Sequence, residues 1–163
     1  MLDEQFLTYI EGARQADLDV GVYFCSQAVT ASEAADEAAF VMDNIKNYTV
    51  TYPIVFRMDT INNDTARTDT LNPKQKTEIA KAFMNTVERE GYFSALYGDK
   101  EFLLTQVVPE QVLSSYDVWL TDLKPVPDYP YQFRMWEYAG GEVLQGVEKE
   151  VSYTISFVDY SRR

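Results

Sequence analysis

The stretch YPIVFRMDT, residues 52–60, combines an apolar run with a charged end. Ile54, Val55 and Phe56 are typical of a buried strand, and Arg57 and Asp59 follow them at alternate positions. Because successive side chains of a strand point to opposite faces, Arg57 and Asp59 should share one face at the carboxyl end of the strand. The stretch therefore predicts a buried strand that ends with a cation and a carboxylate side by side.

Upstream of this strand, the pattern predicts a helix, a strand and a second helix. Apolar residues recur at helical spacing over residues 3–16, and a run rich in Val, Tyr and Phe predicts a strand over residues 19–26. The capping-box pattern of Thr30 and Glu33 then indicates the start of a helix that continues to Asn44.

Downstream, the alternation of strands and helices continues. Residues 60–71 are predicted to be a polar loop, Asn72 and Pro73 are typical of a helix start, and Gly91 is typical of a helix end. The remaining predictions are strands over 94–97, 117–121, 132–138 and 151–158, a short helix over 100–107 and a turn at Gly140–Gly141. Repeated strand–helix units indicate an α/β fold with a parallel sheet, either a barrel or a doubly wound sheet, that closes with hairpin-like strands.

The charge balance and the residue types exclude several function classes. The 163 residues include 14 Lys and Arg against 26 Asp and Glu, and the net charge of -12 disfavours nucleic acid and anionic membrane surfaces as partners. With Cys25 as the only cysteine and no histidine, intrachain disulfides, Cys/His zinc sites and His-dependent triads are excluded. Acid–base chemistry must therefore use carboxylates or tyrosines, no metal or cofactor is predicted, and Cys25 is expected to be a small buried hydrophobe.

Five stretches, taken in order along the chain, carry a family resemblance. They are DEQFLTYIEGARQADLDVGVYFCSQAVTASEAADEAAFV, YPIVFRMDT, GYFSALYGDKEFL, YDVWL and YQFRMWEYAGGEVLQGVEKEVSYTISFVDYS. Together they resemble the glycoside hydrolase family 25 lysozymes, muramidases that cleave the peptidoglycan glycan between N-acetylmuramic acid and N-acetylglucosamine.

The resemblance implies an α/β fold, a modified TIM-type (β/α) barrel with its site at the carboxyl ends of the strands. Residues 1–163 are expected to form a single family 25-like domain that is incomplete at its N-terminus and lacks the first two strands of the barrel. Such a barrel has two open strand edges, and unpaired edges favour pairing with another chain. The chain is therefore expected to be marginally stable, to self-associate through these edges, or to be only part of a gene product.

The resemblance also assigns the charged end of the opening stretch. In the family, the matching strand ends in an Asp-x-Glu pair whose glutamate protonates the departing sugar oxygen. This sequence has Arg57 and Asp59 there, and a guanidinium beside Asp59 lowers the pKa of a carboxyl that would have to keep its proton. A late family aspartate aligns with Ser152. The degenerate catalytic positions Arg57, Asp59 and Ser152 therefore imply an impaired or inactive muramidase.

Aromatic residues on the predicted strands lie where the family lines its sugar groove. The candidate substrate-binding residues are Tyr23, Tyr97, Trp119, Trp136, Glu137 and Tyr138, because aromatic rings suit the apolar face of a pyranose and polar tips can satisfy its hydroxyls. The alternative is that these aromatics are core side chains, which we favour for Trp119. Arg57 and Asp59 likewise have alternatives: a structural ion pair, residual catalysis through Asp59, or binding of an anionic ligand.

Three functions remain open. The first is a muramidase-like domain that binds the peptidoglycan glycan chain without cleaving it well. The second is an active muramidase with relocated carboxylates, using Asp59 with Glu137 or with an acid from the missing N-terminal part. The third is a non-enzymatic interaction module that pairs through open strand edges. The resemblance implies a secreted or cell-wall-associated protein, although the sequence shows no signal peptide and no apolar run near the ~18 residues of a membrane span.

Overall fold

A computed structural model describes residues 2–58, 66–147 and 149–162 of the chain. Six strands form one sheet in which each strand pairs with its neighbour in sequence. The first five strands are parallel and the last is antiparallel to the fifth. The strands are β1 (Val22–Cys25), β2 (Ile54–Arg57), β3 (Ser94–Asp99), β4 (Asp117–Thr121), β5 (Met135–Glu142) and β6 (Val151–Ser156).

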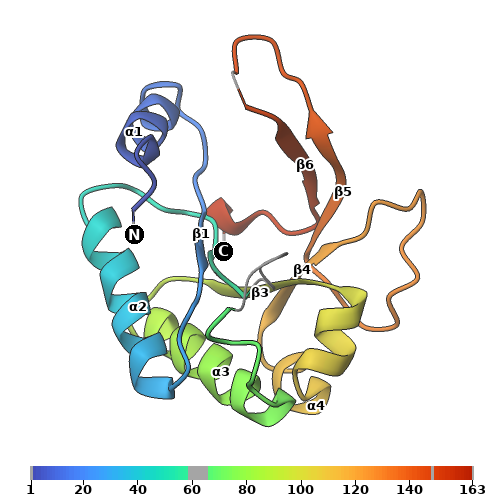
Figure 1. The fold of residues 1–163 in the computed structure, drawn as a ribbon. Coiled ribbons are helices and arrows are strands. Elements are labelled where there is room, and N and C mark those ends of the chain that lie inside the picture. The colour runs from blue at the N-terminus through green and yellow to red at the C-terminus, as the bar shows by residue number, and fades with distance from the viewer. Residues whose placement is uncertain (1, 59–65, 148, 163) are drawn as a thin grey trace.

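Helices α2 (Ala31–Ile45) and α3 (Pro73–Arg89) connect the first three parallel strands and cover one face of the sheet. A π-helical segment η1 (Phe102–Gln106) and the short helix α4 (Pro109–Val112) lie between β3 and β4, α1 (Phe6–Gln15) precedes β1, and a 3-10 turn η2 (Tyr160–Arg162) follows β6. Figure 1 shows α2 and α3 side by side against the sheet, while the β5–β6 hairpin extends beyond them. The sheet is thus a curled half-barrel, as the predicted partial (β/α) barrel requires.

Local sequence signals determine where α3, the helix after β2, begins. The side chain of Asn72 accepts a hydrogen bond from Gln75 N at 3.0 Å, and the Gln75 side chain accepts one from Asn72 N at 3.0 Å. Pro73 occupies the first turn, where its missing N–H costs nothing. Gly91, with a φ of 87°, follows the last turn, so the predicted limits of this helix are confirmed.

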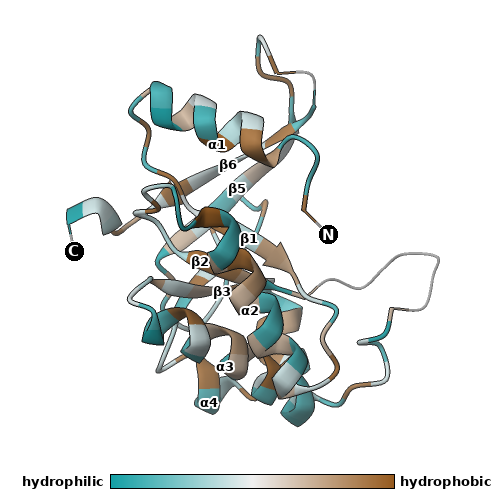
Figure 2. Cartoon of the chain, turned by 90° about the vertical axis from the view of Figure 1, so that its left-hand side faces the viewer, coloured by the Kyte–Doolittle hydropathy of each residue, from teal (hydrophilic) through white to brown (hydrophobic). Residues whose placement is uncertain are grey.

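Alternation along β2 divides its side chains between two cores. Ile54 and Phe56, both 0% exposed, pack in the main core with the helices, whereas Val55 belongs to a smaller cluster on the inner face of the sheet. On the other side of the main core, α2 buries Ala34 and Ala38 at four-residue spacing. Figure 2 accordingly shows hydrophobic and hydrophilic residues interspersed along α2 and α3. The buried strand predicted over residues 54–59 is confirmed from Ile54 to Arg57, and Asp59 lies outside the described residues.

A C-terminal aromatic side chain closes the amino end of the half-barrel. Tyr160, 2% exposed, packs against Tyr52 and Phe93 with ring centroids 5.3 Å apart in each pair. Its hydroxyl donates to Asp117 Oδ2 at 2.8 Å. The segment after β6 therefore returns beneath the sheet and ties the last element to the inner cluster.

The predictions for Gly140–Gly141 and for Cys25 are wrong. Gly140 and Gly141 do not form a turn, because β5 continues through them to Glu142 and the register with β6 shifts at this point. Gly141 has a φ of 72°, which suits a bulge within a strand. Cys25 is exposed, because it points away from the helices, like Tyr23, toward the open inner side of β1.

In the described part of the chain, every helix is too short or too polar to cross a membrane.

Candidate functional site

A cleft of about 890 Å³ occupies the inner face of the half-barrel. This volume lies within the range of small-molecule sites, roughly 300–1,000 Å³. All six strands or their flanking residues contribute to it. Its lining residues are Asp19, Gly21, Val22, Tyr23, Tyr52, Pro53, Val55, Arg57, Tyr97, Trp119, Met135, Glu137, Glu150, Val151, Ser152, Thr154 and Ser156.

Arg57 lies at the carboxyl end of β2 and is held against aromatic rings in this cleft. Its guanidinium carbon is 4.7 Å from the ring centroid of Tyr97 and 5.9 Å from that of Tyr23. Both distances fall within the range of cation–π attraction. Arg57 therefore lies on the face of β2 that lines the cleft.

A carboxylate is held across the neighbouring strands by two hydroxyl donors. Glu137 Oε1 accepts a hydrogen bond from Tyr97 Oη at 3.1 Å and another from Thr121 Oγ1 at 3.2 Å. Burial raises the pKa of the Tyr97 phenol, and the adjacent Glu137 carboxylate raises it further, against the opposing effect of Arg57. The phenol is therefore protonated at neutral pH and serves as a donor that fixes Glu137.

With this geometry in view, the comparisons with known proteins identify the family. The family model described as glycosyl hydrolases family 25 matches residues 1–147. The chain belongs to family 25. A search of curated protein sequences finds no match.

Solved structures similar to this family 25 chain share its fold at low sequence identity. The autolysin LytC from Streptococcus pneumoniae is 20% identical, with 94% of this chain and 37% of that chain covered and a TM-score of 0.78. The catalytic domain of endolysin ply40 from bacteriophage P40 of Listeria monocytogenes is 14% identical, with 99% and 79% covered and a TM-score of 0.76. The bacterial lysozyme from Streptomyces coelicolor is 14% identical, with 98% and 77% covered and a TM-score of 0.73. This chain thus spans little more than a third of LytC.

The cleft brings together six of the nine site residues expected from the family 25 resemblance. They are Tyr23, Arg57, Tyr97, Trp119, Glu137 and Ser152. Trp119 combines both of its anticipated roles, because it lines the cleft and also packs edge-on against Tyr97, with centroids 5.2 Å apart, in the inner cluster. Asp59, the expected general-acid position, lies outside the described residues.

Trp136 and Tyr138 lie on the other face of β5 from Glu137. Trp136 Nε1 donates to the carbonyl of Asp122 at 2.7 Å, and the Tyr138 ring stacks on that of Tyr153. Since neighbours in a strand point to opposite faces, Glu137 cannot share the cleft with the residues on either side of it. The alternation of side chains along the predicted strand could already have shown, from the sequence, that Trp136 and Tyr138 lie on the opposite face from Glu137.

Several cleft residues escaped the sequence analysis, among them two acids and a tyrosine that each precede a strand. Asp19 precedes β1, Tyr52 precedes β2, and Glu150 precedes β6. Residues that precede a strand carry no periodic pattern, and Glu150 lies far along the chain from the others, so only the folded sheet brings them to one surface. Together with Glu137, Asp19 and Glu150 make the cleft rich in carboxylates.

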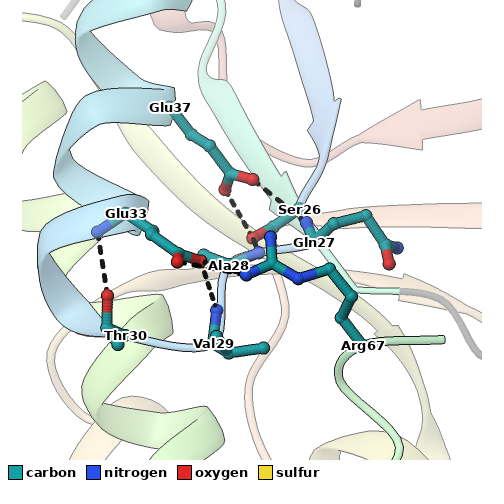
Figure 3. A network of polar contacts seen from close by, with 8 residues as sticks. All are labelled: Ser26, Gln27, Ala28, Val29, Thr30, Glu33, Glu37 and Arg67. Atoms are coloured by element: carbon teal, nitrogen blue, oxygen red, sulfur yellow. Dashed lines mark hydrogen bonds and ion pairs between the residues drawn. The ribbon is translucent and has the colours of Figure 1, made fainter.

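A polar network fixes the loop between β1 and α2 (Figure 3). Ser26 N donates to the carbonyl of Arg57 at 2.7 Å, and Ser26 Oγ donates to Glu37 Oε2 at 2.6 Å. Glu37 also accepts from Gln27 N at 3.0 Å. The network therefore ties the end of β2, through the buried Ser26, to α2.

The capping box predicted at the start of α2 is only half present. Thr30 accepts a hydrogen bond from Glu33 N at 3.2 Å, but the Glu33 carboxylate accepts from Val29 N instead of from Thr30 N. Arg67 donates to both oxygens of Glu33, at 3.1 and 3.2 Å. These partners lower the pKa of Glu33, the backbone N–H of Val29 most of all.

Within residues 2–58, 66–147 and 149–162, no three acidic or cysteine side chains gather closely enough to hold a metal ion.

Proposed function

We propose that this family 25 chain binds the glycan of peptidoglycan in its cleft and hydrolyses it poorly or not at all. The observation that carries the proposal is Arg57, whose guanidinium lies over Tyr97 inside the cleft. The resemblance expects a carboxylate at this position, beside the general acid. A fixed cation opposes the positive charge that develops on the sugar ring in the transition state, so it disfavours glycosidic cleavage.

Sugar binding is supported by the chemistry of the cleft. Tyr23, Tyr97 and Trp119 offer aromatic surface, and Glu137 offers an oriented acceptor for hydroxyl or amide donors. LytC has also been solved with a synthetic peptidoglycan ligand, and the Cpl-1 endolysin with a peptidoglycan analogue. By analogy with these autolysins and endolysins, the bacterial cell wall is the proposed place of action.

A turbidity assay on bacterial cell walls tests the loss of hydrolysis. The wild type is expected to leave the suspension turbid, whereas the double variant Arg57→Asp with Asp59→Glu, which returns the family's pair of carboxylates, is expected to clear it measurably. Circular dichroism serves as the folding control for each protein. If the wild type clears the walls and Asp59→Asn abolishes the clearing, the chain is an active muramidase with relocated carboxylates, and the proposed impairment is wrong.

Cosedimentation with insoluble peptidoglycan tests binding separately. Tyr23 is 60% exposed and lines the cleft, so Tyr23→Ala should weaken binding about fivefold while leaving the fold intact. Tyr9, 57% exposed on α1, is the matched control, and Tyr9→Ala should bind like the wild type. Equal binding by all three proteins would contradict the assignment of the cleft.

A second candidate function is an interaction module that pairs through open strand edges. The observation that favours it is the strand order, since β1 and β6 each have one neighbour in the described sheet. Light scattering after size exclusion distinguishes this candidate, because a monomer at all concentrations argues against pairing.

A further inference from the structure

The β5–β6 hairpin has a second exposed surface, on the side away from the cleft. Ser152, Thr154 and Ser156 line the cleft, so the residues that alternate with them along β6 point outward. The neighbours of Glu137 on β5 point to the same outer side. These outward side chains, which we call the outer aromatic face, are Trp136, Tyr138, Tyr153, Ile155 and Phe157.

Contacts join these side chains into one surface. The Tyr138 ring lies 5.9 Å from that of Trp136 and 6.3 Å from that of Tyr153, between centroids, and Trp136 is directly opposite Ile155 in the strand register. Apart from Trp136, the members are 37–58% exposed. Figure 1 shows the hairpin extending beyond the helices, and none of the described helices packs closely on β5 or β6. A contiguous exposed apolar surface of this kind marks a binding site.

The chemistry of the outer aromatic face favours an uncharged ligand with hydroxyl groups. The face itself carries no charge, whereas the net charge of -12 repels anionic partners and opposes a second copy until the protein is concentrated. The phenol hydroxyls of Tyr138 and Tyr153 make no hydrogen bond to a described residue, so both can bond to a ligand. Aromatic faces with polar tips match a pyranose, which has an apolar face and a rim of hydroxyls.

We propose that the outer aromatic face binds an uncharged stretch of glycan strand, as a second site separate from the cleft. The choice of a glycan as the ligand rests on the function proposed above. Because the two sites lie on opposite faces of the hairpin, they engage different stretches of glycan. Two sites on one chain hold it on an insoluble polysaccharide more firmly than the cleft alone, since the second contact becomes intramolecular.

The two tryptophans of the chain report on the two sites separately. Trp119 lines the cleft, and Trp136 belongs to the outer aromatic face, where its Nε1 donates to the Asp122 carbonyl. Their indole N–H signals in a proton–nitrogen correlation spectrum are assigned with Trp119→Phe and Trp136→Phe. The probe is chitotetraose, the uncharged tetramer of N-acetylglucosamine. Both signals of the wild type should shift during the titration, each with its own affinity.

Variants of exposed tyrosines separate the sites. Tyr153→Ala should weaken the binding followed at Trp136 about fivefold and leave that at Trp119 unchanged, whereas Tyr153→Phe keeps the ring and should lose less. Tyr23→Ala should have the reverse effect, because Tyr23 lines the cleft. Tyr9→Ala, on α1, is the control and should match the wild type at both signals. Circular dichroism checks the folding of each variant.

The outcomes distinguish failure of this inference from failure of the proposed function. If only Trp119 responds in the wild type, or if Tyr153→Ala leaves the Trp136 titration unchanged, the second site is wrong and binding in the cleft stands. If only Trp136 responds, binding in the cleft is wrong and the second site stands. If neither signal responds, both are wrong. A Trp136 signal that moves with protein concentration but not with chitotetraose would show that a second copy covers the face, and would overturn the inference.

Discussion

Asp17 adopts a left-handed backbone conformation where α1 ends. Its φ is 55°, and it is the one residue other than glycine with a positive φ among those described. Leu18 N donates to the Ala13 carbonyl at 3.0 Å and Asp17 N to that of Arg14 at 3.2 Å, the two bonds of a Schellman motif. The motif favours glycine at the position of Asp17, because a Cβ there is strained.

Replacing Asp17 by glycine should therefore stabilise the protein. Asp17→Gly should raise the free energy of unfolding by about 0.5–1 kcal/mol, since the relief of strain exceeds the added freedom of the unfolded chain. Asp17→Asn, which removes the unfavourable negative charge near the helix C-terminus but keeps the Cβ, should give a smaller gain. Urea unfolding measures both, and a destabilised glycine variant would contradict the strain argument.

Tyr129 carries a buried hydroxyl in the loop between β4 and β5. The side chain is 7% exposed, and its Oη has no hydrogen-bond partner among the described residues. Burial raises the pKa of Tyr129 to about 12. The folded protein consequently keeps this proton at pH values where the unfolded chain, with a phenol pKa of about 10, has lost it.

Stability should therefore fall as the pH rises from about 10 to about 12, because the unfolded state binds fewer protons there. Tyr129→Phe should be neutral or mildly stabilising at pH 7, since it removes an unsatisfied polar group. At about pH 11 it should be clearly more stable than the wild type. Urea midpoints at the two pH values test this, with exposed Tyr9→Phe as the control. A Tyr129→Phe variant with the same alkaline decline as the wild type would contradict the assignment.

At the residue scale, the sequence predicts what alternation determines and misses what packing determines. Alternation predicted that Arg57 and Asp59 share one face of the strand, and the structure has Arg57 on the cleft side, opposite Ile54 and Phe56 in the main core. Trp136 was assigned to the groove by resemblance, although its neighbour Glu137 excludes it from that face. Cys25 was expected to be buried because of its type, but its face of β1 is open. A family resemblance predicts which strand carries a residue, whereas the alternation of side chains along that strand determines which face of the sheet the residue lies on.

Among the elements, α3 and η1 are joined by a buried lysine. Lys76 is 6% exposed and donates from Nζ to Gln106 Oε1 at 2.7 Å. Nearby, Val108 N donates to Thr77 Oγ1 at 2.8 Å. Two polar contacts therefore hold the segment after β3 against the first turns of α3.

Loss of the Gln106 acceptor should weaken this junction. Gln106→Leu should lower the free energy of unfolding by about 2 kcal/mol, because the buried ammonium would lose a hydrogen bond that assists its charge. Gln106→Glu keeps an acceptor, adds an opposite charge and should be at least as stable as the wild type. Chemical denaturation of the three proteins tests this. Equal losses in the two variants would indicate that packing, rather than the hydrogen bond, is responsible.

At the element scale, strong terminal signals gave accurate limits and glycine alone did not. Asn72, Pro73 and Gly91 marked α3 because each satisfies a specific backbone need at a helix end. Gly140 and Gly141 were assigned to a turn, but the chain uses them to shift register within β5. The bend comes later, where Val147 N donates to the Leu144 carbonyl at 3.0 Å. A glycine pair between two apolar runs can therefore form a turn or a bulge within one strand.

For the whole molecule, the edge strands predict self-association at high concentration. β6 has no charged residue and no proline, and Ile155 is 42% exposed on its outer face. Such an edge is a template for pairing. Light scattering should detect dimers or larger species, and Ile155→Lys should suppress them. Leu7→Lys, at a 54% exposed position of α1, is the control and should leave association unchanged. A monomer at every concentration would contradict this expectation.

At the whole-molecule scale, the order of strands and helices predicted the parallel half-barrel well. The packing of Tyr160 beneath the sheet was not predicted, because a lone aromatic residue near the C-terminus carries no periodicity. Its partners Tyr52, Phe93 and Asp117 are distant in sequence, and no local pattern links them. Local sequence patterns predict the main core. The inner cluster that contains Tyr160 instead depends on contacts between residues that are distant in sequence.

The strand order also has a consequence for biosynthesis. Since each strand from β2 to β6 pairs with the one synthesised just before it, the sheet can grow strand by strand while the ribosome is still adding residues. Sequential pairing keeps contact order low for a parallel sheet and favours rapid folding. The docking of Tyr160 against Tyr52 must wait until translation has passed η2, so it should form after the pairing of β1 to β6.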